Sequence, residues 1–205
     1  TFTNSAKVII GKLISVGSTG LANRYIFNNN AGGEIAIDNS TSNGLDNISG
    51  TFTNVAKITI GANASVGSDG LYNRGTFNNN AGGEISIDNA NFYGLNNMSG
   101  SFNNAAMVTI GANTSPGNYG LGNMGIFNNN AGGEIAIDNS TFTGLRNQSG
   151  GTFTNAAKIT IGANASVGDD GLDNFAIFNN NSGSDIAIDN SLAIGLYNVS
   201  GTFTN

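Results

Sequence analysis

The sequence contains no cysteine, no histidine and only one proline. Without cysteine and histidine the chain can form no disulfide, and it offers no thiolate nucleophile, no imidazole base and none of the usual ligands of zinc or copper. Charged residues occupy 10% of positions, and the formal net charge is −6. Nucleic acids bind basic surfaces, so this charge predicts no nucleic-acid partner. We also expect no cofactor.

Long apolar stretches are absent as well. None reaches the roughly 18 residues that a membrane-spanning helix needs, so we expect no membrane insertion. The sequence instead has 39% apolar residues, 31 glycines and a still larger number of asparagines. Disordered chains combine low hydrophobicity with high net charge, which does not describe this composition. The composition favours a repetitive β structure with many turns.

The sequence is an internal repeat. The string FNNNAGGEIAIDN at 27–39 returns with few changes at 77–89, 127–139 and 178–190. The string TFTNVAKITIGAN at 51–63 has relatives that start at Thr1, Ser101 and Thr152. Successive phenylalanines of these strings lie 25 residues apart, or 26 where Gly150 and Gly151 add one residue. Two types of 25-residue unit, A and B, therefore alternate along the chain.

The repeat predicts the domain organisation. We expect one continuous segment over residues 1–205, with super-repeats at 1–50, 51–100, 101–151 and 152–201. The chain begins and ends in the same phase, with TFTN. We therefore expect it to be a piece of a longer protein, so the lack of a signal peptide carries little weight.

Apolar and polar residues alternate within each unit, as they do in strands. In the second A unit, Phe52, Ile58 and Ile60 share one face, whereas Thr53 and Lys57 share the other. Each unit should carry three short strands: one with the phenylalanine, one with the isoleucine pair and one after a Gly-Leu dipeptide. No helical period is visible.

These strands could form a stack or a ring. A propeller would use each 50-residue pair as one blade. However, FNNN lacks the hairpin turn signals of antiparallel strands, and stacking explains why like residues recur at like positions. We predict an all-β fold, a parallel β-solenoid of about eight coils in alternating A and B types. The long coil favours the right-handed form, and strands about 4.8 Å apart give a stack roughly 38 Å long.

Stacking places equivalent residues in columns. We expect a continuous inward stack of phenylalanines, and inward asparagine ladders in which each amide bonds to the copies above and below. The phenylalanines are Phe2, Phe27, Phe52, Phe77, Phe102, Phe127, Phe153, Phe178 and Phe203. The asparagines two residues after leucine are Asn23, Asn47, Asn73, Asn97, Asn123, Asn147, Asn174 and Asn198. Those two residues after phenylalanine include Asn4, Asn29, Asn54 and Asn79.

Two further expectations concern the turns. The leucine of each Gly-Leu dipeptide should point inward, and its glycine should supply an unusual φ angle at a corner. A third asparagine column, at Asn63, Asn113 and Asn164, is matched by Leu13 in the first coil. A polar surface site seldom exchanges with leucine, so we expect this column to be buried.

An outward column before the isoleucine pair alternates in charge. Its members are Lys7, Glu34, Lys57, Glu84, Met107, Glu134, Lys158 and Asp185. Like charges on neighbouring strands are destabilising. We predict that this charge ladder, with Met107 as its one defect, is one reason for the 50-residue super-repeat.

Carboxylates are the remaining side chains that could act as catalytic acids and bases or as cation ligands. One acidic column comprises Asp38, Asp88, Asp138 and Asp189. Its members would lie about 9–10 Å apart, near the spacing of an inverting carboxylate pair, but identical positions offer no distinct acid and base. Asp169 and Asp170 lack the ligand spacing of a calcium loop, which favours a solvated turn. We therefore predict that the chain is not an enzyme and has no catalytic residue and no metal site.

The strings GTFTN, AKITIGAN and FNNNAGGEIAIDN resemble the repeats of large bacterial surface β-solenoids of the filamentous-haemagglutinin-like and giant-adhesin kind. They are also similar to tracts in very long extracellular appendage proteins. The resemblance covers the whole chain. It implies secretion, great length and a role in adhesion or filament building, and it carries over no specific ligand residue.

Two functions follow as hypotheses. The first is a structural segment of the shaft of an extracellular filament, appendage or adhesin stalk, which polymerises or associates with copies of itself at the cell surface. Phe92, Phe142, Tyr93 and Tyr119 could mark lateral contacts between parallel chains. The alternative is a binding module that recognises glycans, such as those of cell surfaces, or ice along one face. Threonine pairs flank the inward phenylalanine but occur only in A units, which weakens the case for ice.

Overall fold

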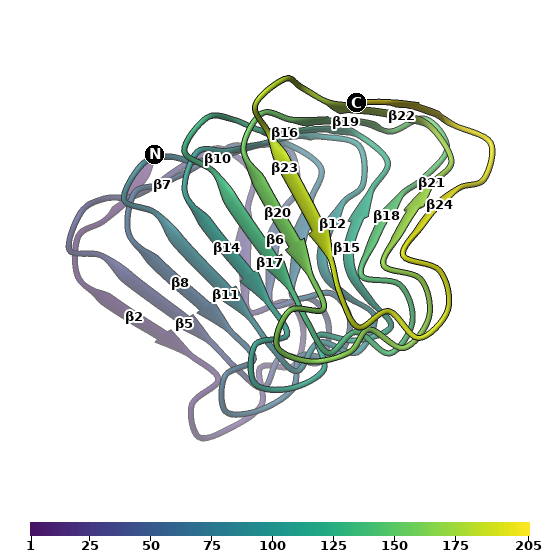
Figure 1. Cartoon of the computed structure of the whole chain (residues 1–205). Coiled ribbons are helices and arrows are strands. Elements are labelled where there is room, and N and C mark those ends of the chain that lie inside the picture. The colour runs from purple at the N-terminus through teal and green to yellow at the C-terminus, as the bar shows by residue number, and fades with distance from the viewer.

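The computed structural model describes all 205 residues. It contains 25 short strands, joined by turns, and no helix. The strands form three parallel sheets that enclose a core of roughly triangular cross-section (Figure 1). The predicted all-β fold and parallel β-solenoid are thereby confirmed. With the C-terminal coil nearest the viewer, the chain runs from right to left across the upper sheet and then down the left one (Figure 1), so the coil is right-handed.

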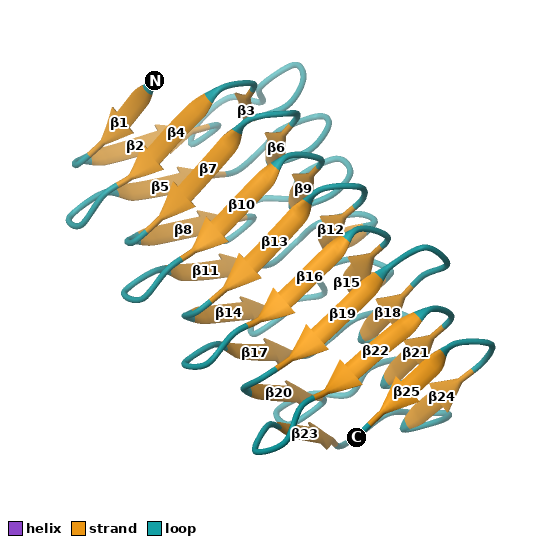
Figure 2. Ribbon diagram, turned by 90° about the horizontal axis from the view of Figure 1, so that it is seen from above, coloured by secondary structure: helices purple, strands orange, loops and turns teal.

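The first sheet holds the phenylalanines, and Figure 2 shows it from above. Its strands are β1 Phe2–Asn4, β4 Ile26–Asn29, β7 Thr51–Asn54, β10 Thr76–Asn79, β13 Ser101–Asn104, β16 Ile126–Asn129, β19 Thr152–Asn155, β22 Ile177–Asn180 and β25 Thr202–Thr204. The second sheet holds the isoleucine pairs. Its strands are β2 Lys7–Ile10, β5 Glu34–Ile37, β8 Lys57–Ile60, β11 Glu84–Ile87, β14 Met107–Ile110, β17 Glu134–Ile137, β20 Lys158–Ile161 and β23 Asp185–Ile188.

The third sheet follows the Gly-Leu dipeptides. Its strands are β3 Leu21–Asn23, β6 Leu45–Asn47, β9 Leu71–Asn73, β12 Tyr93–Asn97, β15 Tyr119–Asn123, β18 Leu145–Asn147, β21 Leu172–Asn174 and β24 Leu196–Asn198. Each coil thus contributes one strand to each sheet, as the sequence predicts.

Neighbouring coils pair in register. Phe52 of β7 pairs with both Phe27 and Phe77, and Ile58 of β8 pairs with Ile35 and Ile85. The extra residue at Gly150–Gly151 is taken up in the turn before β19, where Gly151 N donates to Gln148 O at 2.9 Å. The register of the first sheet therefore continues unchanged, with Phe127 paired to Phe153.

The core consists of columns of identical or similar side chains. Alternating strand residues point inward, which gives burial patterns such as that of β7, where Phe52 and Asn54 are buried. The nine phenylalanine rings form one stack, with centroids 4.6–5.0 Å apart between neighbours. Burial of each such side chain is worth about 1.5–3 kcal/mol, so the columns are the main source of stability.

The glycines before the leucines correct one prediction. None of them has a positive φ angle. They are required instead because the third and second sheets approach closely: a Cβ on Gly70 would lie 2.4 Å from Ile87 Cγ2 and 2.6 Å from Gly94 O. Positive φ angles occur at other turn glycines and at four asparagines. These are Asn39, Asn89, Asn139 and Asn190.

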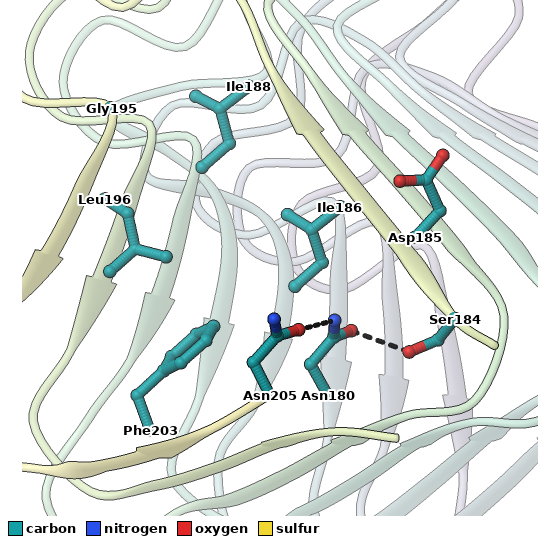
Figure 3. A pocket seen from close by; sticks show the side chains of 9 residues that line it. All are labelled: Asn180, Ser184, Asp185, Ile186, Ile188, Gly195, Leu196, Phe203 and Asn205. Atoms are coloured by element: carbon teal, nitrogen blue, oxygen red, sulfur yellow. Dashed lines mark hydrogen bonds between the residues drawn. The ribbon is translucent and has the colours of Figure 1, made fainter. Parts of the chain in front are cut away.

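The inner columns are uncovered at both ends of the stack. At the C-terminal end, Leu196, Phe203, Ile186 and Ile188 line a hollow into which no further coil packs (Figure 3). At the N-terminal end, Phe2 is 53% exposed. The hollow in Figure 3 is thus the open end of the core and not a shaped ligand site.

Candidate functional site

Two asparagine ladders run the length of the stack inside the core. In each ladder, every Nδ2 donates to the Oδ1 of the equivalent asparagine one coil closer to the C-terminus. In the first ladder, Asn4, Asn29, Asn54, Asn79, Asn104, Asn129, Asn155, Asn180 and Asn205 are joined at 2.6–2.9 Å. In the second, Asn23, Asn47, Asn73, Asn97, Asn123, Asn147, Asn174 and Asn198 are joined at 2.8–2.9 Å.

The same amides also satisfy backbone carbonyls at the corners. Asn97 Nδ2 donates to Ile126 O at 2.9 Å, beside its bond to Asn123. Because all amides of both ladders point the same way, the stack has a polar axis, and each coil fits only one face of its neighbour. A buried amide without these bonds would be costly, so the ladders specify register as well as stability.

The charge column lies on the outer face of the second sheet, with the eight residues in the predicted order. Ion pairs join Lys7 to Glu34 at 2.7 Å and Lys158 to Glu134 at 2.8 Å. The hydrogen bond that Lys158 donates to Glu134 raises the pKa of Lys158. Met107 lies between two glutamates and is itself exposed. All of these charges face solvent, so each pair stabilises little.

The acidic column has a structural role that the sequence did not reveal. Asp38 accepts hydrogen bonds from the backbone N of Asn63 and Ala64 at 3.0 and 3.3 Å and from Asn63 Nδ2 at 3.0 Å. Asp88 and Asp138 bind the equivalent groups of the next A coil. The third asparagine column is exposed, contrary to the prediction of burial. Each of its side chains covers a buried aspartate and donates a hydrogen bond to it.

The outer face of the first sheet does not carry the same side chain on every coil. The residue directly before each core phenylalanine points outward and is threonine, serine or isoleucine. Ile26, Ile126 and Ile177 are about half exposed at this position. This face is regular in backbone but mixed in chemistry.

The third sheet has a different outer surface, which we call the third-sheet groove. The sheet bends inward at the right of Figure 1, between the loops that enter and leave it. The floor of the groove is the outward strand column Asp46, Tyr72, Asn96, Gly122, Arg146 and Asp173. The loop-side wall is Asn43, Asp69, Tyr93, Tyr119, Thr143 and Asp170. The opposite wall includes Arg74, Met98, Met124, Gln148 and Phe175. The residue type changes with almost every coil of the groove.

Charged and aromatic residues of the groove contact one another across coils. Arg74 pairs with Asp46 at 3.0 Å and lies 5.1 Å over the ring of Tyr72. Arg146 donates to Tyr119 Oη at 3.0 Å. Burial raises the pKa of Asp46 although Arg74 opposes the effect, and burial also raises the pKa of Tyr72. The groove is thus partly desolvated despite its polar lining.

Asp170 and Asp173 correct the prediction of a solvated turn. Both are buried, and Asp170 accepts a hydrogen bond from the backbone N of Ile194 at 2.9 Å. Thr143 Oγ1 donates to Asp173 Oδ2 at 3.1 Å. Burial, followed by the neighbouring carboxyl group of Asp170, raises the pKa of Asp173 to about 6. Asp169, by contrast, is exposed, as the sequence predicts.

Sequence reasoning missed this groove because it searched for columns that repeat. One signal was available: each of the three arginines of the chain lies either in the floor column of the groove or two residues after a residue of that column. They are Arg24, Arg74 and Arg146. Four of the five tyrosines, Tyr72, Tyr93, Tyr119 and Tyr197, fall in the floor column or the loop-side wall.

The fold defines the chain as a β-solenoid repeat protein. No protein-family model, no curated protein sequence and no solved structure matches it. The structure offers no helix that could serve as a transmembrane span.

Proposed function

We propose that the chain is a structural segment of the shaft of a bacterial extracellular filament, appendage or adhesin stalk. The observation that carries this proposal is the unbroken phenylalanine stack, in which nine rings continue through every coil at 4.6–5.0 Å without a change of register. A structure of this kind gains length by about 4.8 Å per coil and needs no new type of contact.

The residues that recur along the chain support the same proposal. The asparagines that recur in every coil bond to the next coil, and the aspartates of the Asp38 column do so in every second coil. These contacts resist axial separation, which is what a shaft requires. The resemblance of the repeats to those of large bacterial surface β-solenoids adds secretion and the cell surface to the proposal.

Self-association is part of this proposal. Phe92 and Phe142 are 45% and 46% exposed, so they are available for contacts between parallel rods. Tyr93 is 5% exposed and packs within its own chain, which leaves it no part in such a contact.

The proposal is tested by immunogold electron microscopy of the source cells with an antibody raised against this chain. We expect gold along thin extended fibres outside the cell, and X-ray diffraction from the isolated fibres should show a spacing of about 4.7–4.9 Å along the fibre axis. Gold confined to the cell interior, or labelled particles that are not elongated, would contradict the proposal.

A further inference from the structure

We propose that the third-sheet groove binds a neutral oligosaccharide, with Tyr72 as the stacking surface and Asp69 and Asn96 as the polar contacts. This inference does not depend on the shaft proposal. It starts from a hollow of about 600 Å³ that spans neighbouring coils of the groove. Its lining includes Asp69, Tyr72, Phe92, Tyr93, Asn96 and Gln148. This volume is typical of small-ligand sites.

The aromatic residues of the hollow are held rigidly. The ring of Tyr93 lies over Gly122, where an added Cβ would be 2.5 Å from Tyr93 Cε1. Gln148 Nε2 donates to Tyr93 Oη at 2.9 Å, and the ring of Tyr119 stacks on Tyr93 at 4.8 Å. Tyr93 is therefore a fixed wall.

Tyr72 supplies the surface that a ligand can reach. It lines the hollow and is only partly buried, and the guanidinium of Arg74 supports its ring from outside the hollow at 5.1 Å. One face of a sugar ring carries C–H bonds with a partial positive charge, which matches the negative face of a tyrosine ring. An aromatic side chain that is supported but not covered is suited to this contact.

The polar groups beside Tyr72 include an acceptor without a donor. Asp69 accepts from the backbone N of Tyr93 at 3.1 Å and from Asn96 Nδ2 at 2.9 Å. The contact with Asp69 turns the amide nitrogen of Asn96 toward the carboxylate. Asn96 Oδ1 then has no partner, although Asn96 is 5% exposed. Asn96 lines the hollow, so a sugar hydroxyl can supply the missing donor once the side chains that cover this oxygen move aside.

Charge selects a neutral ligand. Arg74 is already paired with Asp46, which leaves the carboxylate of Asp69 as the unpaired charge of the hollow. Sulfated or uronic-acid sugars would meet this negative charge. A neutral sugar offers hydroxyl donors to Asp69 and Asn96 and a C–H face to Tyr72, so it fits all three groups.

The test uses the intact chain and three soluble probes: cellohexaose, chitohexaose and maltohexaose. The protein has no tryptophan and five tyrosines, of which Tyr72 and Tyr93 line the hollow, so intrinsic tyrosine fluorescence reports binding. We expect at least one probe to bind saturably, with a Kd below about 1 mM by calorimetry. Tyr72→Ala should weaken this binding at least about tenfold, and Tyr25→Ala, which alters an exposed tyrosine outside the hollow, should not change it.

A second variant keeps the proposal testable if Tyr72→Ala does not fold. Met98 lines the hollow and is 39% exposed, so Met98→Arg should fold and should obstruct the hollow, with a similar loss of affinity. Absence of binding to all three probes would overturn the proposal. Binding that survives both substitutions, or a preference for heparin or polygalacturonate over the neutral probes, would also overturn it.

Discussion

At the scale of single residues, buried amides join each coil to the next. Asn97 is fully buried, accepts from Asn73 Nδ2 at 2.8 Å and donates to Asn123 Oδ1 at 2.8 Å. No water can replace these bonds in the core, so loss of one amide leaves polar groups of two neighbours without partners.

Substitution Asn97→Ala is therefore expected to lower the free energy of unfolding by about 2–4 kcal/mol, because it leaves a buried donor and a buried acceptor unpaired. Urea denaturation followed by circular dichroism measures this loss. Asn80→Ala is the matched control, since Asn80 is exposed and its side chain makes no hydrogen bond. Equal stability of the two variants would mean that the ladder does not hold the coils together.

Gly70 tests the close approach of the third and second sheets. The added methyl group of Gly70→Ala would meet Ile87 Cγ2 and Gly94 O at 2.4 and 2.6 Å, so we expect a loss of about 1–3 kcal/mol from overpacking. Gly17→Ala is the control, because a Cβ there meets nothing within 4 Å and its φ angle is not positive. A melting temperature for Gly70→Ala equal to that of the control would rule out the crowding.

The carboxyl pair of Asp170 and Asp173 predicts a pH effect. The pKa of Asp173 is raised to about 6 in the folded chain, so this group contributes stability that is fully present below its unfolded pKa of 3.8. The contribution is lost as the pH rises from about 4 through about 6. Thr143 and Arg146, which also face Asp173, do not titrate in this range.

Asp173→Asn should remove this component. As the pH rises from 4 to 7, we expect the melting temperature of the wild type to fall relative to that of Asp173→Asn. Asp169→Asn, which alters the neighbouring exposed carboxylate, should show no such change. A difference between wild type and Asp173→Asn that is constant with pH would refute the raised pKa.

At the scale of strands, the second sheet carries the charge ladder with one interruption. Met107 of β14 pairs with Glu84 of β11 and Glu134 of β17. Met107→Lys would restore the alternation and should stabilise the chain by up to about 1 kcal/mol at low salt. Met107→Glu, the matched control, should destabilise it by placing three acids in a row.

Salt distinguishes this effect from a change in packing. Both effects should shrink in about 0.5 M sodium chloride, because exposed charges are screened over a few ångströms at that concentration. Thermal melts at two salt concentrations measure this. A gain for Met107→Lys that is unaffected by salt would show that the ladder does not act through charge.

The strands and the core columns that repeat could be predicted from the sequence. The groove, whose residues do not repeat, could not. The columns of Phe52 and Ile58 were predicted because residues of the same type recur every 25 residues. Tyr72 and Asn96 occupy one column but differ in type, so periodicity gave no reason to place them together. The crowding at Gly70 was also hidden, because a glycine in a sequence does not tell whether φ or space requires it.

At the scale of the whole molecule, stability must come from the contact between coils. A coil of 25 residues loses about 1–2 kcal/mol per residue in backbone entropy on ordering, which its own few buried side chains cannot offset. Each inner column gains a neighbour only when another coil stacks. Folding should therefore be cooperative along the axis, as in other linear repeats.

The parallel, in-register stack is tested most directly by paired cysteines, because the chain has none of its own. Thr53, Asn78 and Asn103 point outward from adjacent strands β7, β10 and β13, and Asn78 pairs with both of the others. Cysteines at 53 and 78, or at 78 and 103, would lie on neighbouring strands, whose backbones are about 4.8 Å apart. Cysteines at 53 and 103 would lie two strands apart, at about 9.6 Å.

With a short bifunctional thiol reagent, we expect rapid cross-linking within both neighbouring pairs and little within the pair at 53 and 103. A propeller would place 78 and 103 in different blades. Failure of the 78 and 103 pair to cross-link in the folded chain, while the 53 and 78 pair reacts, would contradict the stack.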